Sequence, residues 1–155
     1  AAAYTDAKTD GNICKSILDD ENCSDTFIVT PSGTRLPITP KFKTTATARY
    51  TWPVWTGRAH AQASITHQGS AGADIRQDIG GGLNPNSFLG RLDGWTLVDL
   101  FAGYSWDRFR AELFATNVFD ERNELVRFVP CSICTQTKIT VGRPRTIGIR
   151  LGASF

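Results

Sequence analysis

Four cysteines are the first residues in this sequence that could do chemistry, and they form two close pairs: Cys14 with Cys23, and Cys131 with Cys134. Two such pairs can form disulfides or bind a metal ion. Both pairs lie in turn-rich sequence with no histidine nearby, and no βαβ pattern follows Cys131-Ser-Ile-Cys134 to support a redox motif. We therefore expect disulfides that brace loops in an oxidising compartment.

The remaining reactive side chains do not form an enzyme-like constellation. His60 and His67 are seven residues apart, which on one strand places them on opposite faces. No cysteine accompanies them as a nucleophile, and no acid is placed to orient a serine–histidine pair. The cluster Asp19-Asp20-Glu21 could bind Ca²⁺, but a solvated acidic loop is the favoured interpretation. We expect no enzyme, no cofactor and no metal site.

Composition excludes several further classes. The chain has 155 residues, 17 Lys+Arg against 15 Asp+Glu, and 41% hydrophobic residues, a globular balance without a nucleic-acid footprint. No apolar window is long enough for a transmembrane helix, and residues 1–6 do not resemble a signal peptide. Since there is no methionine, we expect residues 1–155 to be the C-terminal segment of a longer protein.

Alternation with period two dominates the sequence and predicts an all-β fold. Six antiparallel strands are expected, near residues 1–8, 42–52, 58–68, 96–106, 109–119 and 146–155. Several carry the pattern for ten residues or more, whereas strands of soluble proteins average about 5–6 residues. A strand that spans a bilayer needs about 9–11 residues. The lengths therefore favour a transmembrane β-barrel segment.

The connections between these strands differ strongly in length. Residues 53–57 and 107–108 form short turns, whereas 9–40, 71–93 and 120–142 form long loops. In an antiparallel meander, the short turns then share one end and the long loops the other. Outer-membrane barrels have this asymmetry, with short periplasmic turns and long extracellular loops. Both cysteine pairs fall in the long loops, on the oxidising side.

The composition of the two strand faces indicates which one meets lipid. Aromatic residues of an interfacial girdle are expected at the short-turn ends of the apolar faces: Tyr50, Trp52, Tyr104 and Trp106. The apolar faces are otherwise rich in alanine, which suits lipid contact better than a packed core. The polar faces carry few charges for a soluble surface. The alternative is a soluble six-stranded sandwich or barrel with a buried apolar face.

Four motifs follow one another along residues 33–155. They are Gly33-Thr-Arg-Leu-Pro-Ile-Thr-Pro-Lys41 with Ala48-Arg-Tyr50, Gly94-Trp-Thr-Leu-Val-Asp-Leu100 with Gly103-Tyr104, Ala115-Thr-Asn-Val-Phe-Asp-Glu-Arg122, and Gly142-Arg-Pro-Arg-Thr-Ile-Gly-Ile-Arg150 ending in Phe155. In order and spacing, these motifs resemble the barrels of TonB-dependent receptors. Val118 stands where this family often has leucine. The resemblance implies a barrel of about 22 strands, plugged by a domain absent from this sequence, of which this chain holds the last six.

The charges of the polar faces would then line the lumen of that barrel. They are Lys41, Lys43, Arg49, Arg58, Arg110 and Arg150 against Asp99 and Glu112. This positive arc could attract anionic ligands or pair with carboxylates of the plug, and both interpretations stay open. The last strand, with Ile147, Ile149, Leu151 and Phe155, resembles the terminal signal recognised by the outer-membrane assembly machinery.

The sequence therefore predicts a receptor in the outer membrane of a Gram-negative bacterium. Such a receptor would import a scarce ligand, most often a ferric siderophore in this family, with energy supplied by TonB through the plug. Its further partners would be the lipid bilayer and lipopolysaccharide, and no nucleic acid is expected. The alternatives are an outer-membrane channel or porin that works without TonB, and a soluble β-barrel that binds a small ligand.

Overall fold

The computed structural model describes residues 1–14, 28–75, 89–129 and 136–154. Cys23, Cys131, Cys134 and Phe155 lie outside the described residues, as does the acidic cluster at 19–21. For Cys14 only the backbone is described. The predicted disulfides and the predicted solvated acidic loop therefore remain predictions.

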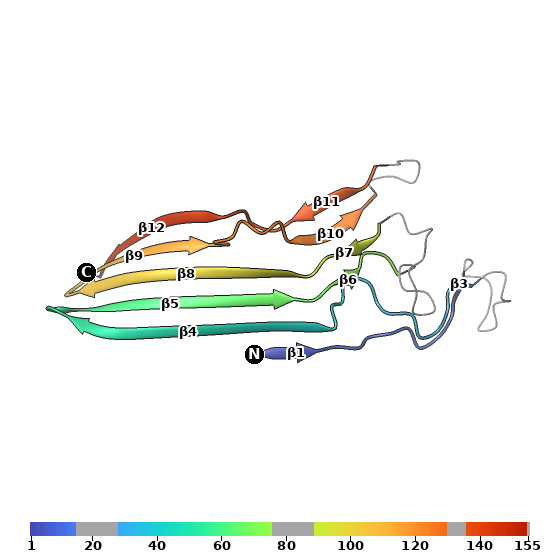
Figure 1. The fold of residues 1–155 in the computed structure, drawn as a ribbon, viewed down its shortest axis with the longest axis horizontal. Helices are drawn as coiled ribbons and strands as arrows, with labels where there is room; N and C mark the ends of the chain where they lie inside the picture. The colour runs from blue at the N-terminus through green and yellow to red at the C-terminus, as the bar shows by residue number, and fades with distance from the viewer. Residues whose placement is uncertain (15–27, 76–88, 130–135, 155) are drawn as a thin grey trace.

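A six-stranded antiparallel sheet forms the body of the molecule (Figure 1). Its strands are β1 (Ala2–Tyr4), β4 (Phe42–Val54), β5 (Gly57–Gln68), β8 (Trp95–Trp106), β9 (Phe109–Thr116) and β12 (Thr146–Ala153). They lie in the order β1-β4-β5-β8-β9-β12, so consecutive long strands are neighbours. The predicted antiparallel barrel segment is confirmed, and within these residues the barrel is an open sheet.

Several predicted boundaries were wrong. The turn placed at 53–57 is only two residues long, because Pro53 still pairs with Arg58 and Val54 with Gly57. The strand expected to reach residue 119 ends at Thr116, since the next residue, Asn117, has a positive φ of 51°. The first strand covers three residues instead of 1–8 and pairs with β4 through Ala2↔Thr44.

Short strands occupy parts of the three segments that were predicted to be loops. They pair as β2 (Ile13–Cys14) with β3 (Ile28–Thr30), β6 (Ala71–Gly72) with β7 (Arg91–Leu92), and β10 (Glu124–Phe128) with β11 (Lys138–Val141). All of them lie at one end of the sheet, opposite the two tight turns (Figure 1). The predicted separation of short and long connections is therefore present.

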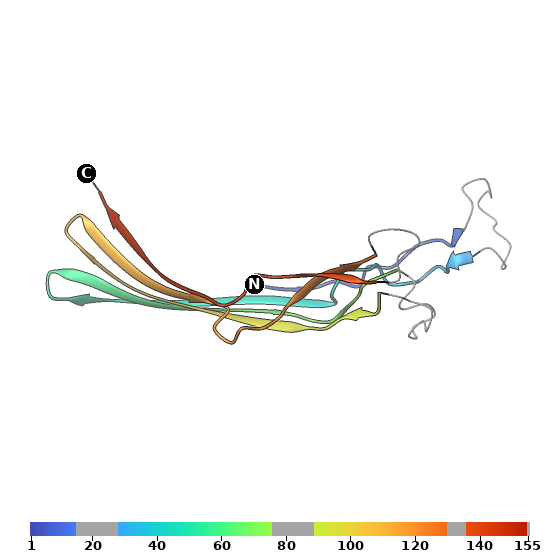
Figure 2. The same cartoon turned by 90° about the horizontal axis from the view of Figure 1, so that it is seen from above.

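The sheet is a single curved layer rather than one half of a sandwich (Figure 2). The buried apolar residues of the described chain are Ala71, Ala73, Leu92 and Trp95, all toward the long-loop end. Leu100, Ile149 and Leu151, by contrast, are 44%, 66% and 75% exposed. A soluble sandwich would bury these three together, so the structure contradicts that alternative. No helix in the part of the chain that the structure describes is long and apolar enough to span a membrane.

Candidate functional site

The strand register sorts the side chains of the long strands onto two faces. Residues directly opposite each other in an antiparallel pair point to the same face. The pairs Arg49↔Gln62, Ser64↔Asp99 and Glu112↔Arg150, with Gly103↔Glu112 linking β8 to β9, therefore place polar residues of all five long strands together. Seven of the eight predicted face charges lie on this polar face: Lys43, Arg49, Arg58, Asp99, Arg110, Glu112 and Arg150. The eighth, Lys41, directly precedes β4.

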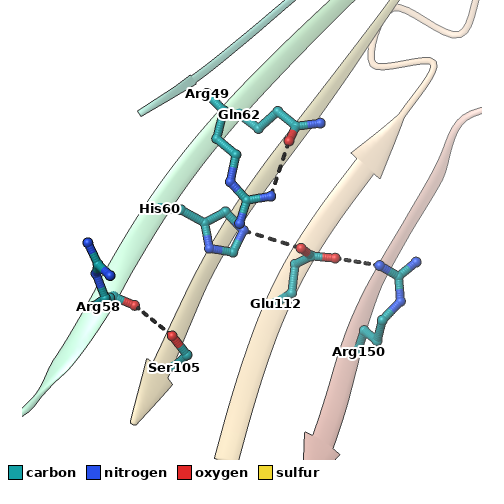
Figure 3. Close-up of polar contacts among 7 residues, drawn as sticks. All are labelled: Arg49, Arg58, His60, Gln62, Ser105, Glu112 and Arg150. Atoms are coloured by element: carbon teal, nitrogen blue, oxygen red, sulfur yellow. Dashed lines mark hydrogen bonds and ion pairs between the residues drawn. The ribbon is translucent and has the colours of Figure 1, made fainter. Parts of the chain in front are cut away.

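Glu112 is the centre of a polar row that crosses the sheet from β5 to β12 (Figure 3). One carboxylate oxygen accepts a hydrogen bond from Arg150 Nη1 at 2.5 Å, and the other lies 3.3 Å from His60 Nε2. The side chains of His60 and Glu112 are only 14% and 21% exposed. The row therefore links three strands, including the last, through one carboxylate.

Gly103 makes this row possible, because it lies on β8 between His60 and Glu112. A Cβ at Gly103 would collide with the His60 imidazole ring. Two more glycines on β12 work in the same way: the Phe114 ring covers Gly148, and the Arg110 side chain covers Gly152. The sequence predicted only that His60 and His67 lie on opposite faces of one strand. The sequence signal for the His60 contact with Glu112 was Gly103, a residue without a side chain in the strand position opposite His60.

Most cations of the polar face have no carboxylate partner in the described part of the chain. Arg49 reaches the amide oxygen of Gln62 at 3.5 Å, and Ser105 Oγ donates to the backbone oxygen of Arg58 at 3.3 Å. Five cations on the strands face two carboxylates, and only Arg150 and His60 contact Glu112. The described face therefore carries a net charge of +3, from five cations and two carboxylates.

The second carboxylate, Asp99, has a structural role at the end of β9. Its Oδ1 accepts a hydrogen bond from the backbone N–H of Asn117 at 2.9 Å. Asn117 is buried, and its Nδ2 donates to the carbonyl oxygens of Glu121 and Arg143, both at 3.0 Å. Its Oδ1 accepts from the backbone N–H of Glu121 at 2.9 Å. Asn117 therefore holds the chain that leaves β9 against the chain that enters β12.

Asp120 makes a second contact in this bend, residues 117–120, which we call the Asn117–Asp120 elbow. Its Oδ1 accepts a hydrogen bond from the backbone N–H of Arg145 at 3.0 Å. Asp120 also has a positive φ of 55°, a conformation that Asn and Asp adopt more readily than most residues. In the sequence, residues 115–122 stood out only as a motif, with no role for its members. The structure shows that Asn117 and Asp120 shape this elbow.

The opposite face carries the predicted aromatic residues near the tight turns. Tyr50 stacks on Trp52 with ring centroids 5.4 Å apart, and Tyr104 stacks on Trp106 at 5.3 Å. Phe109, which was not predicted, extends the second stack at 5.9 Å from Trp106. All five residues belong to the apolar face by register.

At the long-loop end of the apolar face, His67 lies 6.2 Å from the Phe42 ring and 2.9 Å from Thr96 Oγ1. The two histidines are therefore on opposite faces, as predicted.

The described residues contain no group of three or more His, Cys, Asp or Glu that could hold a metal ion. Beyond β1, a hydrogen bond from the Lys8 ammonium group keeps the pKa of Asp6 below its ordinary value.

A family model described as TonB dependent receptor-like, beta-barrel, matches residues 1–118, which is more than half of the chain. The chain belongs to this family of TonB-dependent receptor β-barrels. Comparisons with curated proteins and with solved structures found no match.

The family is one of outer-membrane transport receptors, so this chain contributes strands to the barrel of a TonB-dependent receptor of a Gram-negative bacterium. The match begins at residue 1, although the resemblance noted in the sequence starts only at Gly33. It ends at Val118, inside the Asn117–Asp120 elbow. The motif at 142–150 lies beyond the matched range, and it forms the entry to β12 and most of that strand.

Proposed function

We propose that residues 1–155 form the C-terminal barrel strands of a TonB-dependent receptor that imports a scarce ligand. A ferric siderophore is the leading candidate, because it is the commonest ligand class of the family. The observation that carries the proposal is the division of one curved sheet into two unlike faces. The exposed face of Ile147, Ile149 and Leu151 suits hydrocarbon, and the face of the Glu112 row suits an aqueous interior.

In this proposal the tight turns lie in the periplasm and the long loops outside the cell. The polar face lines the lumen, and the aromatic stacks lie in the inner-leaflet interface, where Tyr and Trp are enriched. The outer face contacts lipid and lipopolysaccharide. TonB acts through a plug domain elsewhere in the full-length protein, and β12 is the strand that the assembly machinery recognises.

Uptake measurements in whole cells test the transport proposal. A strain that lacks the full-length receptor should lose uptake of ⁵⁵Fe-labelled siderophores under iron limitation, and a plasmid copy should restore it. The same plasmid should fail in a strain without TonB, because the energy source is missing. Uptake that persists without TonB would indicate a passive channel instead.

A further inference from the structure

A cavity of about 440 Å³ opens on the polar face beside the Glu112 row. Its lining includes Arg49, His60, Ser105, Arg110, Glu112 and Arg150. Arg49 belongs to β4, and the row runs from His60 on β5 through Glu112 on β9 to Arg150 on β12 (Figure 3). The volume lies in the range of about 300–1,000 Å³ that is typical of ligand pockets. The cavity is therefore large enough for a multi-atom group.

The charges around this cavity do not balance. Three guanidinium groups, from Arg49, Arg110 and Arg150, face one carboxylate, which leaves a surplus of three minus one. Both oxygens of Glu112 already have a partner, because Arg150 contacts one and His60 the other. Within the described residues, Arg49 and Arg110 have no carboxylate partner. The lining therefore offers two guanidinium groups to an incoming anion.

Glycines on the neighbouring strands make room for two side chains of the lining. The Arg110 side chain lies over Gly152, where an added Cβ would come within 2.6 Å of Nε. His60 lies over Gly103 in the same way, and its contact with Glu112 orients it. Arg49 and Arg110 are exposed, so their guanidinium groups are accessible to an anion on the polar face.

We propose that this cavity is an anion-binding site that takes a carboxylate or a phosphate group through Arg49 and Arg110. The planar guanidinium fork matches both groups and can bind them through two hydrogen bonds. The proposal rests on the proposed function, in which the polar face lines an enclosed interior. In that aqueous interior the surplus positive charge attracts anions, because a charged cavity with protein walls focuses the electric field.

The anion could belong to a small molecule in transit or to an acidic side chain from another part of the full-length receptor. Both present the same chemistry, so the first arm of the test uses a soluble probe. Citrate is titrated calorimetrically into the purified full-length receptor in detergent. The double variant Arg49→Gln, Arg110→Gln should bind at least about tenfold more weakly, as expected when charged partners are removed.

Lys43→Gln is the matched control, because it removes one positive charge from the same face at the far end of β4. It should change the citrate affinity by less than about twofold, within the range of a screened distant charge. A heat-modifiability gel confirms that each variant is folded. Arg49 and Arg110 are exposed and make no ion pair in the described structure, so their replacement should leave folding intact.

The second arm detects an acidic side chain that already fills the site. In Arg110→Lys, a carbodiimide should join the new amine to a nearby carboxylate as an amide, which mass spectrometry of peptides identifies. The wild type, which has arginine there, controls for background. A cross-link to an acid outside residues 1–155 identifies an internal partner and supports the site.

Citrate binding that depends on Arg49 and Arg110 supports the site and shows that it is open to a soluble anion. The proposal is overturned if citrate binding does not depend on these arginines and no such cross-link forms. Either result leaves the TonB-dependent uptake experiment untouched, so the two proposals can fail separately.

Discussion

Asn117 combines burial, a positive φ and three side-chain hydrogen bonds at the point where the chain turns from β9 toward β12. Asn117→Ala would leave Glu121 and Arg143 backbone groups unpaired and place alanine in a conformation that it disfavours. We expect a loss of about 2–4 kcal/mol in the free energy of unfolding. Urea titration of the full-length receptor in lipid vesicles, followed by tryptophan fluorescence, measures it.

Asn117→Gly separates the two causes, because glycine tolerates the positive φ but cannot make the hydrogen bonds. It should destabilise the receptor less than Asn117→Ala does. If both variants stay within about 0.5 kcal/mol of the wild type, the range of ordinary surface substitutions, the elbow contributes nothing to stability.

Gly103 offers a second test at the residue scale, because His60 reaches Glu112 across it. Gly103→Ala should displace the imidazole ring and destabilise the receptor by about 1–3 kcal/mol, as overpacking usually does. Adding His60→Ala should recover part of this loss, since neighbouring residues that clash are not additive. Gly11→Ala, with no atom within 4 Å of the new Cβ, is the control and should be neutral. Strict additivity of Gly103→Ala and His60→Ala would refute the contact.

At the scale of the elements, the sequence predicted the five long strands because alternation over many residues leaves little freedom in the assignment of faces. β10 and β11 were not predicted, because both are short and a register shift between Glu124 and Val126 interrupts the alternation. The faces of the candidate site were predictable from each strand alone. The contact between His60 and Glu112 was not predictable, because it depends on the register of three neighbouring strands.

The outward direction of the apolar face can be tested on β12. Ile149→Arg should cost about 2–4 kcal/mol if this position lies near the bilayer midplane. Thr47→Arg places the same charge on the polar face of β4, where the threonine is exposed and hydrogen-bonds only to Ser64 in the described structure. It should cost less than about 1 kcal/mol. Equal costs in vesicle refolding would contradict the assignment of the two faces.

Deletion of Phe155 tests β12 as the strand that the assembly machinery recognises. The terminal aromatic residue is expected to help an exposed strand edge pair with another chain during assembly. The full-length receptor without Phe155 should therefore reach the membrane at a reduced level, measured as the folded band in a heat-modifiability gel. Ser154→Ala, which leaves the terminal aromatic residue in place, is the control. Unchanged levels after the deletion would refute this role.

At the scale of the whole molecule, an open sheet of six strands has two unpaired edges, on β1 and on β12. The edges expose unpaired backbone groups, and one face exposes Ile147, Ile149 and Leu151. Together the two features disfavour a stable monomer in water, and lipid cannot satisfy the backbone groups of an open edge.

The 155-residue chain expressed by itself should therefore aggregate in aqueous buffer or stay in solution only with detergent. Size-exclusion chromatography with light scattering, with and without detergent, measures this directly. Aggregation should be largely independent of ionic strength, because it comes from strand edges and apolar surface rather than from charge. A monodisperse monomer in buffer would mean that the apolar face is covered within this chain, and the assignment of that face to lipid would then be wrong.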